Sequence, residues 1–163
     1  MEIMLRDARE DDFGAILSLN DAEVQHTSEM DIARLRELAA MATYQKVACL
    51  NRRVVAFLLA MSHDAPYRND NFAWFSARFA KFIYVDRIVI DKSCAGLGTG
   101  TLLYEDLFRY ARSAAIGVIT CEYNIEPPNH ASRRFHDKFG FREIGTRWVE
   151  AGVKRVSLQA TDA

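Results

Sequence analysis

The chain has 163 residues, half of them apolar and about a quarter charged, and its formal net charge is −1. This length suits one compact domain over residues 1–163 with its own core. The near-neutral charge, with no long run of one sign, argues against a nucleic-acid interface or a polybasic membrane patch. We therefore expect no nucleic-acid partner and no membrane partner.

The cysteines and the N-terminus predict a cytoplasmic protein without metal. Cys49, Cys94 and Cys121 are scattered and show neither zinc-ligand spacing nor a disulfide framework. The N-terminus is charged from its second residue and lacks the apolar segment of a signal peptide. No stretch approaches the roughly 18 consecutive apolar residues that a membrane span needs.

The first part of the chain predicts a strand over 2–6, two helices and a hairpin. Asp11 or Asp12 is expected to cap the first helix. A turn at Asn51 and Arg52 separates two runs typical of hairpin strands. The first helix is expected to carry Phe13, Ile16, Leu17 and Val24 on one side. The second helix, about 30–42, has Ile32, Leu35 and Leu38 at helical spacing, and the hairpin strands are 45–50 and 53–61.

The remainder predicts strands and helices in alternation. Segment 63–81 is long for a connection and carries Phe72, Phe75 and Phe79 at helical spacing, which indicates a helix. Strands with helices between them predict an α/β fold with a mixed sheet. The further expected elements are a strand over 82–90, a helix over 98–113, a strand over 117–124, a helix from Asn129 to about 139, and a hairpin of 141–149 and 153–158.

Three glycines, Gly96, Gly98 and Gly100, stand between the strand 82–90 and the helix that follows. Glycines at a helix start let an anion approach bare backbone N–H groups. No Walker A pattern is present. A dinucleotide fingerprint requires a glycine at its sixth position, where the chain has Thr101 or Leu103, so a dinucleotide site is a weaker alternative.

Two motifs carry a family resemblance. The loop from Ala95 to Gly100 reads A-G-L-G-T-G, which fits the acyl-CoA loop [QR]-x-x-G-x-[GA] at all but its first position. The run from Asn129, NHASRRFHDKFGF, is similar to N-x-x-[AS]-x-x-[FL]-Y-x-K-x-G-F. The matching residues are Asn129, Ser132, Phe135, Lys138, Gly140 and Phe141. The two motifs resemble those of the GNAT superfamily of acyl-CoA N-acyltransferases, and the distance between them along the chain is the usual one for that superfamily.

The resemblance implies a mostly antiparallel mixed sheet flanked by helices, with a splayed pair of central strands, and acetyl-CoA as cosubstrate. It places the pantetheine arm along the strand that ends with Ile88, Val89 and Ile90. Asn129 is either a cofactor contact or simply a helix N-cap. The diphosphate is expected on backbone N–H groups of Gly96, Leu97, Gly98, Thr99, Gly100 and Thr101.

Two carboxylates are candidates for the base that deprotonates the amine, with water as a third possibility. Asp86 lies mid-strand among apolar neighbours, and alternation points the adjacent Arg87 to the other face, so Arg87 is not an obvious partner. Glu122 lies on the polar face of the next strand. Alternatively, each carboxylate forms a structural ion pair.

The chain departs from the family pattern at two positions. Ala95 replaces a basic or amide residue, and His136 replaces the usual tyrosine. His136 is either the acid that protonates the leaving thiolate or a structural helix histidine. Cys94 has no patterned histidine that would activate it as a nucleophile.

The expected activity is N-acetylation of a small-molecule or peptide amine by direct attack in a ternary complex. The alternative is a non-catalytic sensor that binds acyl-CoA. The aromatic segment 67–82 is the expected source of acceptor selectivity. The sequence is also compatible with a homodimer that forms through the C-terminal hairpin.

Overall fold

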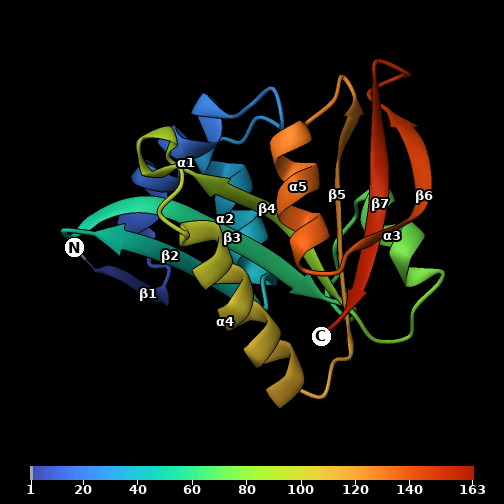
Figure 1. The fold of residues 1–163 in the computed structure, drawn as a ribbon, viewed down its shortest axis with the longest axis horizontal. Helices are drawn as coiled ribbons and strands as arrows, with labels where there is room; N and C mark the ends of the chain where they lie inside the picture. Colours follow the sequence, from blue (N-terminus) through green and yellow to red (C-terminus); the bar gives the residue numbers. More distant parts are fainter. Residues whose placement is uncertain (1) are drawn as a thin grey trace.

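A seven-stranded sheet runs through the computed structural model, which describes residues 2–163 (Figure 1). Its strands lie in the order β1-β2-β3-β4-β5-β7-β6. The strands are β1 (Ile3–Asp7), β2 (Tyr44–Leu50), β3 (Arg53–Ser62), β4 (Ile83–Ile90), β5 (Val118–Glu126), β6 (Arg142–Val149) and β7 (Lys154–Asp162). The helices are α1 (Phe13–Ala22), α2 (Ile32–Met41), α3 (Asp70–Ser76), α4 (Thr99–Ser113) and α5 (His130–Lys138), with short 3-10 turns η1 (Glu10–Asp12) and η2 (Lys92–Cys94). Over residues 2–163, no helix has the length and apolar character needed to cross a membrane.

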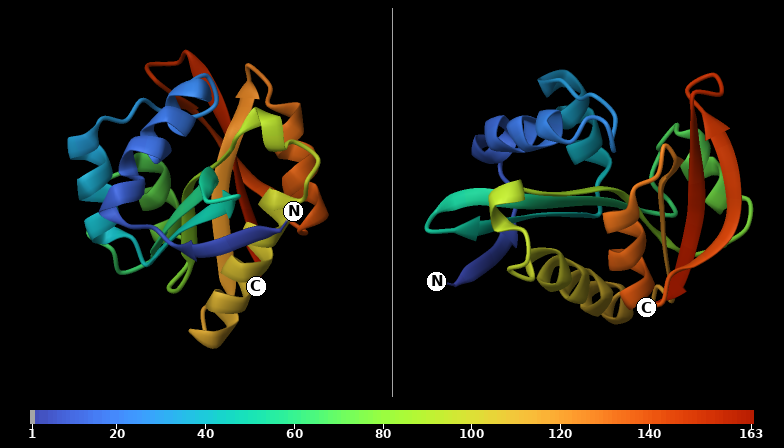
Figure 2. Two further views of the ribbon diagram at one scale, coloured as in Figure 1. Left: turned by 90° about the vertical axis from the view of Figure 1, so that its left-hand side faces the viewer. Right: turned by 45° about the horizontal axis from the view of Figure 1, so that its top comes forward.

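The strands β4 and β5 are joined only at one end. They are parallel neighbours, and within residues 2–163 they pair only at Ile83 with Ile119 and at Tyr84 with Thr120. At this junction the Thr120 hydroxyl donates to the Ile83 carbonyl over 3.1 Å. Beyond it the strands diverge, as Figures 1 and 2 show. The predicted splayed pair in a mixed, mostly antiparallel sheet is therefore confirmed.

A β-bulge interrupts β4 just past this junction. Val85 pairs with Ala60 on β3 and Arg87 pairs with Leu59, so Asp86 is an extra residue without a partner in the ladder. A bulge bends its strand and re-aims side chains. It lies where β4 leaves β5, and it breaks the strict alternation of side chains that the sequence pattern alone would predict.

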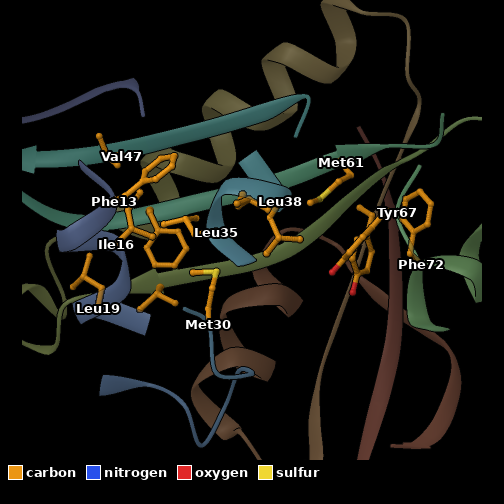
Figure 3. Close-up of a cluster of buried hydrophobic side chains, with 14 of the residues drawn as sticks. Phe13, Ile16, Leu19, Met30, Leu35, Leu38, Val47, Met61, Tyr67 and Phe72 are labelled. Atoms are coloured by element: carbon orange, nitrogen blue, oxygen red, sulfur yellow. The ribbon is translucent and has the colours of Figure 1, made fainter. Parts of the chain in front are cut away.

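Helices cover both faces of the sheet. The helices α1, α2 and α3 bury their apolar side chains on one face, where Phe13, Leu35 and Phe72 belong to one cluster (Figure 3). On the other face, Leu103 and Phe108 of α4 join Phe141 in a second cluster. Figure 2 shows α1 and α2 across the sheet from α4. The two clusters cover both faces of β4, and beyond Tyr84 the edge of β4 that faces β5 is unpaired within residues 2–163.

Some local expectations are wrong. Val24 does not belong to the first helix, because α1 ends at Ala22, and its side chain is 36% exposed. Asp12 does not cap α1 with its side chain. Instead it accepts two 2.7 Å hydrogen bonds from Arg6 of β1. Phe79 lies beyond the end of α3 but still packs against the first cluster.

Candidate active site

Two cavities meet at the gap between β4 and β5. The first, which we call the α5-side cavity, measures about 400 Å³ and is lined by residues 85–90 of β4 and by α5. The second, the hairpin-side cavity, measures about 250 Å³ and is lined by the α1–α2 loop, residues around α3 and the start of β7. Both cavities share His26, Thr27, Asp86, Arg87, Glu122 and Tyr123 as wall residues.

Glu122 stands on β5 two residues beyond the β4–β5 junction. Its Oε1 accepts hydrogen bonds from the Tyr84 hydroxyl at 2.6 Å and from Asn71 Nδ2 at 3.1 Å. Its Oε2 is buried and has no hydrogen-bond partner among the described residues. Burial raises the pKa of Glu122 to about 7, with the Tyr84 hydrogen bond opposing that rise and nearby Asp86 adding to it. A carboxylate with one free oxygen and a pKa near neutrality is suited to accept a proton.

Asp86 faces the same gap but has both oxygens engaged. Arg87 Nε donates to Oδ2 at 2.7 Å, and the Tyr67 hydroxyl donates to Oδ1. Both side chains of the Asp86–Arg87 pair are over nine-tenths buried. The expectation that Arg87 points away from Asp86 is therefore wrong, because the bulge at Asp86 removes the alternation on which it rested.

Arg87 also fastens the α1–α2 loop to the sheet. Its Nη1 donates to the Ser28 carbonyl at 3.1 Å and to Asn20 Oδ1 at 3.2 Å, and its Nη2 donates to Ser28 Oγ at 3.2 Å. Asn20 in turn donates to the Ser28 carbonyl at 2.9 Å. Since His26 and Thr27 of this loop line both cavities, the Asp86–Arg87 pair anchors a loop that forms part of both cavity walls.

His136 lies in the α5-side cavity wall, where both of its ring nitrogens are engaged. Nδ1 lies 2.7 Å from the Ser132 carbonyl, which only accepts, so Nδ1 carries the proton in this contact. Nε2 then accepts from the Tyr104 hydroxyl at 2.6 Å. Burial lowers the pKa of His136 to about 4. These contacts favour a neutral, structural histidine over an acid.

The glycine loop forms an open cradle at the start of α4. Gly96 and Gly98 have φ of +81° and +77°, and nothing lies within 4 Å of a Cβ built on either. α-helix geometry leaves the first N–H groups of α4 without intrahelical acceptors. Thr99 Oγ1 beside them is buried and has no partner among the described residues. Orphaned donors at a helix N-terminus with open space in front fit a diphosphate.

Gly100 serves a different purpose, since a Cβ there would lie 2.8 Å from Ile90 and 3.0 Å from Phe135. It therefore permits close packing of α4 against β4 and α5.

The structure gathers most of the predicted site residues at one place. Ile88, Val89 and Ile90 line the α5-side cavity, and within residues 2–163 none of these three pairs with β5. Asn129 both lines this cavity and caps α5, accepting from Ser132 N at 3.2 Å. Residues 96–101 lie outside the cavity lining, on the loop and first turn of α4 that follow β4.

The sequence pattern did not identify Asn71, Tyr84 or Tyr104 as site residues. Tyr84 shares the period-two face of Asp86, which is the one signal that could have found it. Asn71 reaches Glu122 across 51 positions of the chain, and Tyr104 reaches His136 across 32. Such contacts depend on tertiary packing that a single sequence does not specify.

Comparisons with known proteins agree with this fold. A phosphinothricin N-acetyltransferase of Streptomyces coelicolor is 35% identical over 98 residues, covering 60% of this chain and 51% of that protein. The match thus spans about half the length of that relative. Ard1 of Thermoplasma volcanium superposes with a TM-score of 0.83 at 13% identity, covering 100% of this chain and 99% of that one. The Escherichia coli ribosomal-protein-S18-alanine N-acetyltransferase gives 0.75 at 13% identity, covering 99% and 94%.

The family itself is established by a sequence match over most of the chain. Residues 4–141 match the Acetyltransferase (GNAT) family, whose members in general use acetyl-CoA as cosubstrate. This span includes the glycine loop, both carboxylates and the whole of α5. The chain therefore belongs to the Acetyltransferase (GNAT) family.

Proposed function

We propose that residues 1–163 act as one acyltransferase domain that moves an acetyl group from acetyl-CoA to a small amine by direct attack in a ternary complex. The observation that carries this proposal is Glu122. Its unpartnered Oε2 belongs to a side chain in the wall shared by the two cavities, and its pKa is raised to about 7. A group with these properties can accept the proton of an amine that enters from the hairpin side.

The α5 side is the proposed cofactor side. Backbone N–H groups of Gly96 and of residues 98–101, together with Thr99 Oγ1, hold the diphosphate, whereas the expected Leu97 N–H is already engaged with the Cys94 carbonyl at 3.3 Å. The free edge of β4 at Ile88–Ile90 holds the pantetheine arm. When bound, acetyl-CoA supplies an activated acetyl group as a thioester. Main-chain N–H groups of β4 polarise the acyl carbonyl.

The two carboxylates have different proposed roles because their hydrogen-bond partners differ. Glu122 removes the amine proton as the amine nitrogen bonds to the acetyl carbon and the C–S bond breaks, so that CoA leaves as a thiolate. Asp86 holds Arg87 and through it the α1–α2 loop. His136 keeps Tyr104 and Ser132 in place and stays neutral.

The proposed acceptor is a small polar amine that also carries an acidic group. The hairpin-side cavity is lined by the amide side chains of Asn69, Asn71 and Asn124 and by the cations Arg34 and Lys154. Arg34 is paired with Glu37 at 3.0 Å and Lys154 with Glu150 at 3.4 Å, so an acidic acceptor would compete with these carboxylates. A carboxylate or phosphinate would be recognised by such cations. Phosphinothricin, which appears in the name of the relative from Streptomyces coelicolor, is an amino acid with a phosphinate and is the first acceptor to test.

The test is release of free CoA from acetyl-CoA with a panel of amines. The panel contains phosphinothricin, amino acids with acidic side chains, and amines of the same size without an acidic group. We expect amine-dependent CoA release that is fastest for acceptors with an acidic group. Tight acetyl-CoA binding with no turnover of any amine would instead support the sensor alternative.

A further inference from the structure

A chain of hydrogen bonds connects Glu122 to the C-terminal hairpin. Arg147 of β6 donates from Nη1 to Asn71 Oδ1 at 2.6 Å. Asn71, in the first turn of α3, donates from Nδ2 to Glu122 Oε1 at 3.1 Å. Three segments far apart in sequence thus meet at one carboxylate.

The direction of this chain is fixed by chemistry. A guanidinium only donates and an ionised carboxylate only accepts. The Asn71 amide must therefore turn its oxygen to Arg147 and its nitrogen to Glu122. Without Arg147, the amide could rotate and present its oxygen to the carboxylate, which would oppose the ionised form of Glu122.

The surrounding packing keeps α3 against the hairpin. Gly145 on β6 lies under the Trp74 ring, and a Cβ at Gly145 would come within 2.5 Å of that ring. Arg78 stacks on the same ring, with its guanidinium 3.4 Å from the Trp74 ring centroid. Arg147 is therefore presented to Asn71 by a close contact between helix and strand, and its side chain is only 27% exposed.

We propose that Arg147 is a positioning residue that orients the Asn71 amide toward Glu122 Oε1 and so leaves Oε2 free for the acceptor amine. This inference rests on the proposed function. The arrangement serves both protonation states of Glu122, since a proton on Oε2 leaves Oε1 able to accept from Asn71 and Tyr84.

Other charged groups also act on Glu122 and must stay constant in a test. From β4, the Tyr84 hydroxyl and the Asp86 and Arg87 side chains influence its titration. The hairpin-side cavity adds His26 and Arg34 and the Glu150–Lys154 ion pair at 3.4 Å. Tyr67 lines the same cavity and is bound to Asp86. Within residues 2–163, the polar contacts of Arg147 are with Asn71 and, at 4.0 Å, with the exposed Asp70, so its replacement isolates the Asn71 route.

The experiment is a ¹³C NMR titration of the glutamate carboxyl carbons in the full chain without substrates. Loss of one resonance in Glu122→Gln assigns Glu122. In Arg147→Met and in Asn71→Leu we expect the pKa of Glu122 to rise by about half a unit or more, because a hydrogen bond to the charged form is lost. Arg147→Lys keeps a donor for Asn71, so the pKa of Glu122 in this variant should lie close to its value in the parent chain.

The matched control is Arg155→Met, since Arg155 belongs to the same hairpin, packs over Trp148 and hydrogen-bonds Thr146 rather than Asn71. It should leave the Glu122 titration unchanged. An unchanged pKa in folded Arg147→Met, or an equal shift in Arg155→Met, would overturn the proposal. Should Arg147→Met unfold, Asn71→Leu and Arg147→Lys decide the question, because they disturb the hairpin less.

The acyl-transfer assay distinguishes this inference from the proposed function. A pKa shift in Arg147→Met combined with full activity of Glu122→Gln would keep the positioning chain and remove Glu122 as the base. Loss of activity in Glu122→Gln with no pKa shift in Arg147→Met would support Glu122 as the base and overturn the positioning role of Arg147.

Discussion

Asp86 and Glu122 are two carboxylates on diverging strands that face one gap, yet their surroundings differ. Asp86 sits at a bulge with both oxygens bonded, one to Arg87 and one to Tyr67. Glu122 has one oxygen bonded twice, while the other has no partner among the described residues. A buried charge with full pairing stabilises a structure only while its partner stays, whereas a buried carboxyl with a free oxygen can exchange a proton. Both carboxylates lie at the gap, so the hydrogen bonding of their oxygens, and not their position, distinguishes the structural role of Asp86 from the chemical role of Glu122.

The largest expected effect comes from replacing Glu122, the carboxylate with the proposed chemical role. Glu122→Gln keeps the shape of the side chain but cannot accept the amine proton. We expect kcat/KM for the best acceptor to fall by roughly 10²- to 10⁴-fold, the usual range for a general base. The control is Glu126→Gln, half-exposed on the same strand, which should retain activity. Full activity of Glu122→Gln would leave water or another group as the base.

The second largest effect is expected from replacing Asp86, the carboxylate with the structural role. Asp86→Asn leaves Arg87 buried with its charge unpaired, and we expect the free energy of unfolding to fall by about 3 kcal/mol in urea titrations. The Glu122→Gln variant should show no comparable loss. If Asp86→Asn were as stable as the parent chain yet as inactive as Glu122→Gln, Asp86 would be the base.

A third variant extends the comparison to the cofactor loop. Gly98→Val places a side chain at a φ of +77° in the open space in front of α4. We expect KM for acetyl-CoA to rise roughly tenfold, as for the loss of one charge-assisted hydrogen bond, with little change in kcat. Gly152→Val imposes the same backbone strain at φ +87° in the β6–β7 turn. Equal changes in KM for both variants would mean that strain, and not diphosphate binding, is responsible.

The smallest effect concerns the pH profile. Glu122 must be ionised to take a proton, so kcat/KM should fall as the pH drops through about 7, the pKa of Glu122. His136, with its pKa lowered to about 4, is neutral on both sides of that limb. His136→Gln should therefore keep the limb in place and change kcat/KM only a few-fold. Loss or displacement of the limb in this variant would show that His136 exchanges a proton during turnover.

The sequence predicts the elements and the family, because these depend on local pattern and two motifs. The strand around Ile83–Ile90, the glycine loop and the capped helix at Asn129 are found as expected. The roles of Asp86 and Glu122 could not be separated in this way. The bulge that turns Arg87 toward Asp86, and the reach of Asn71 to Glu122, arise from pairing between distant segments. The acidity of His136 likewise depends on burial that its local sequence does not reveal.

The most direct test is a crystal structure of the chain with acetyl-CoA or a non-reactive thioether analogue. We predict the diphosphate on the backbone of residues 96–101, the pantetheine arm along the free edge of β4, and the acyl carbon nearer to Glu122 Oε2 than to either oxygen of Asp86. An empty glycine loop, or a gap closed by continuous pairing of β4 with β5, would contradict the account.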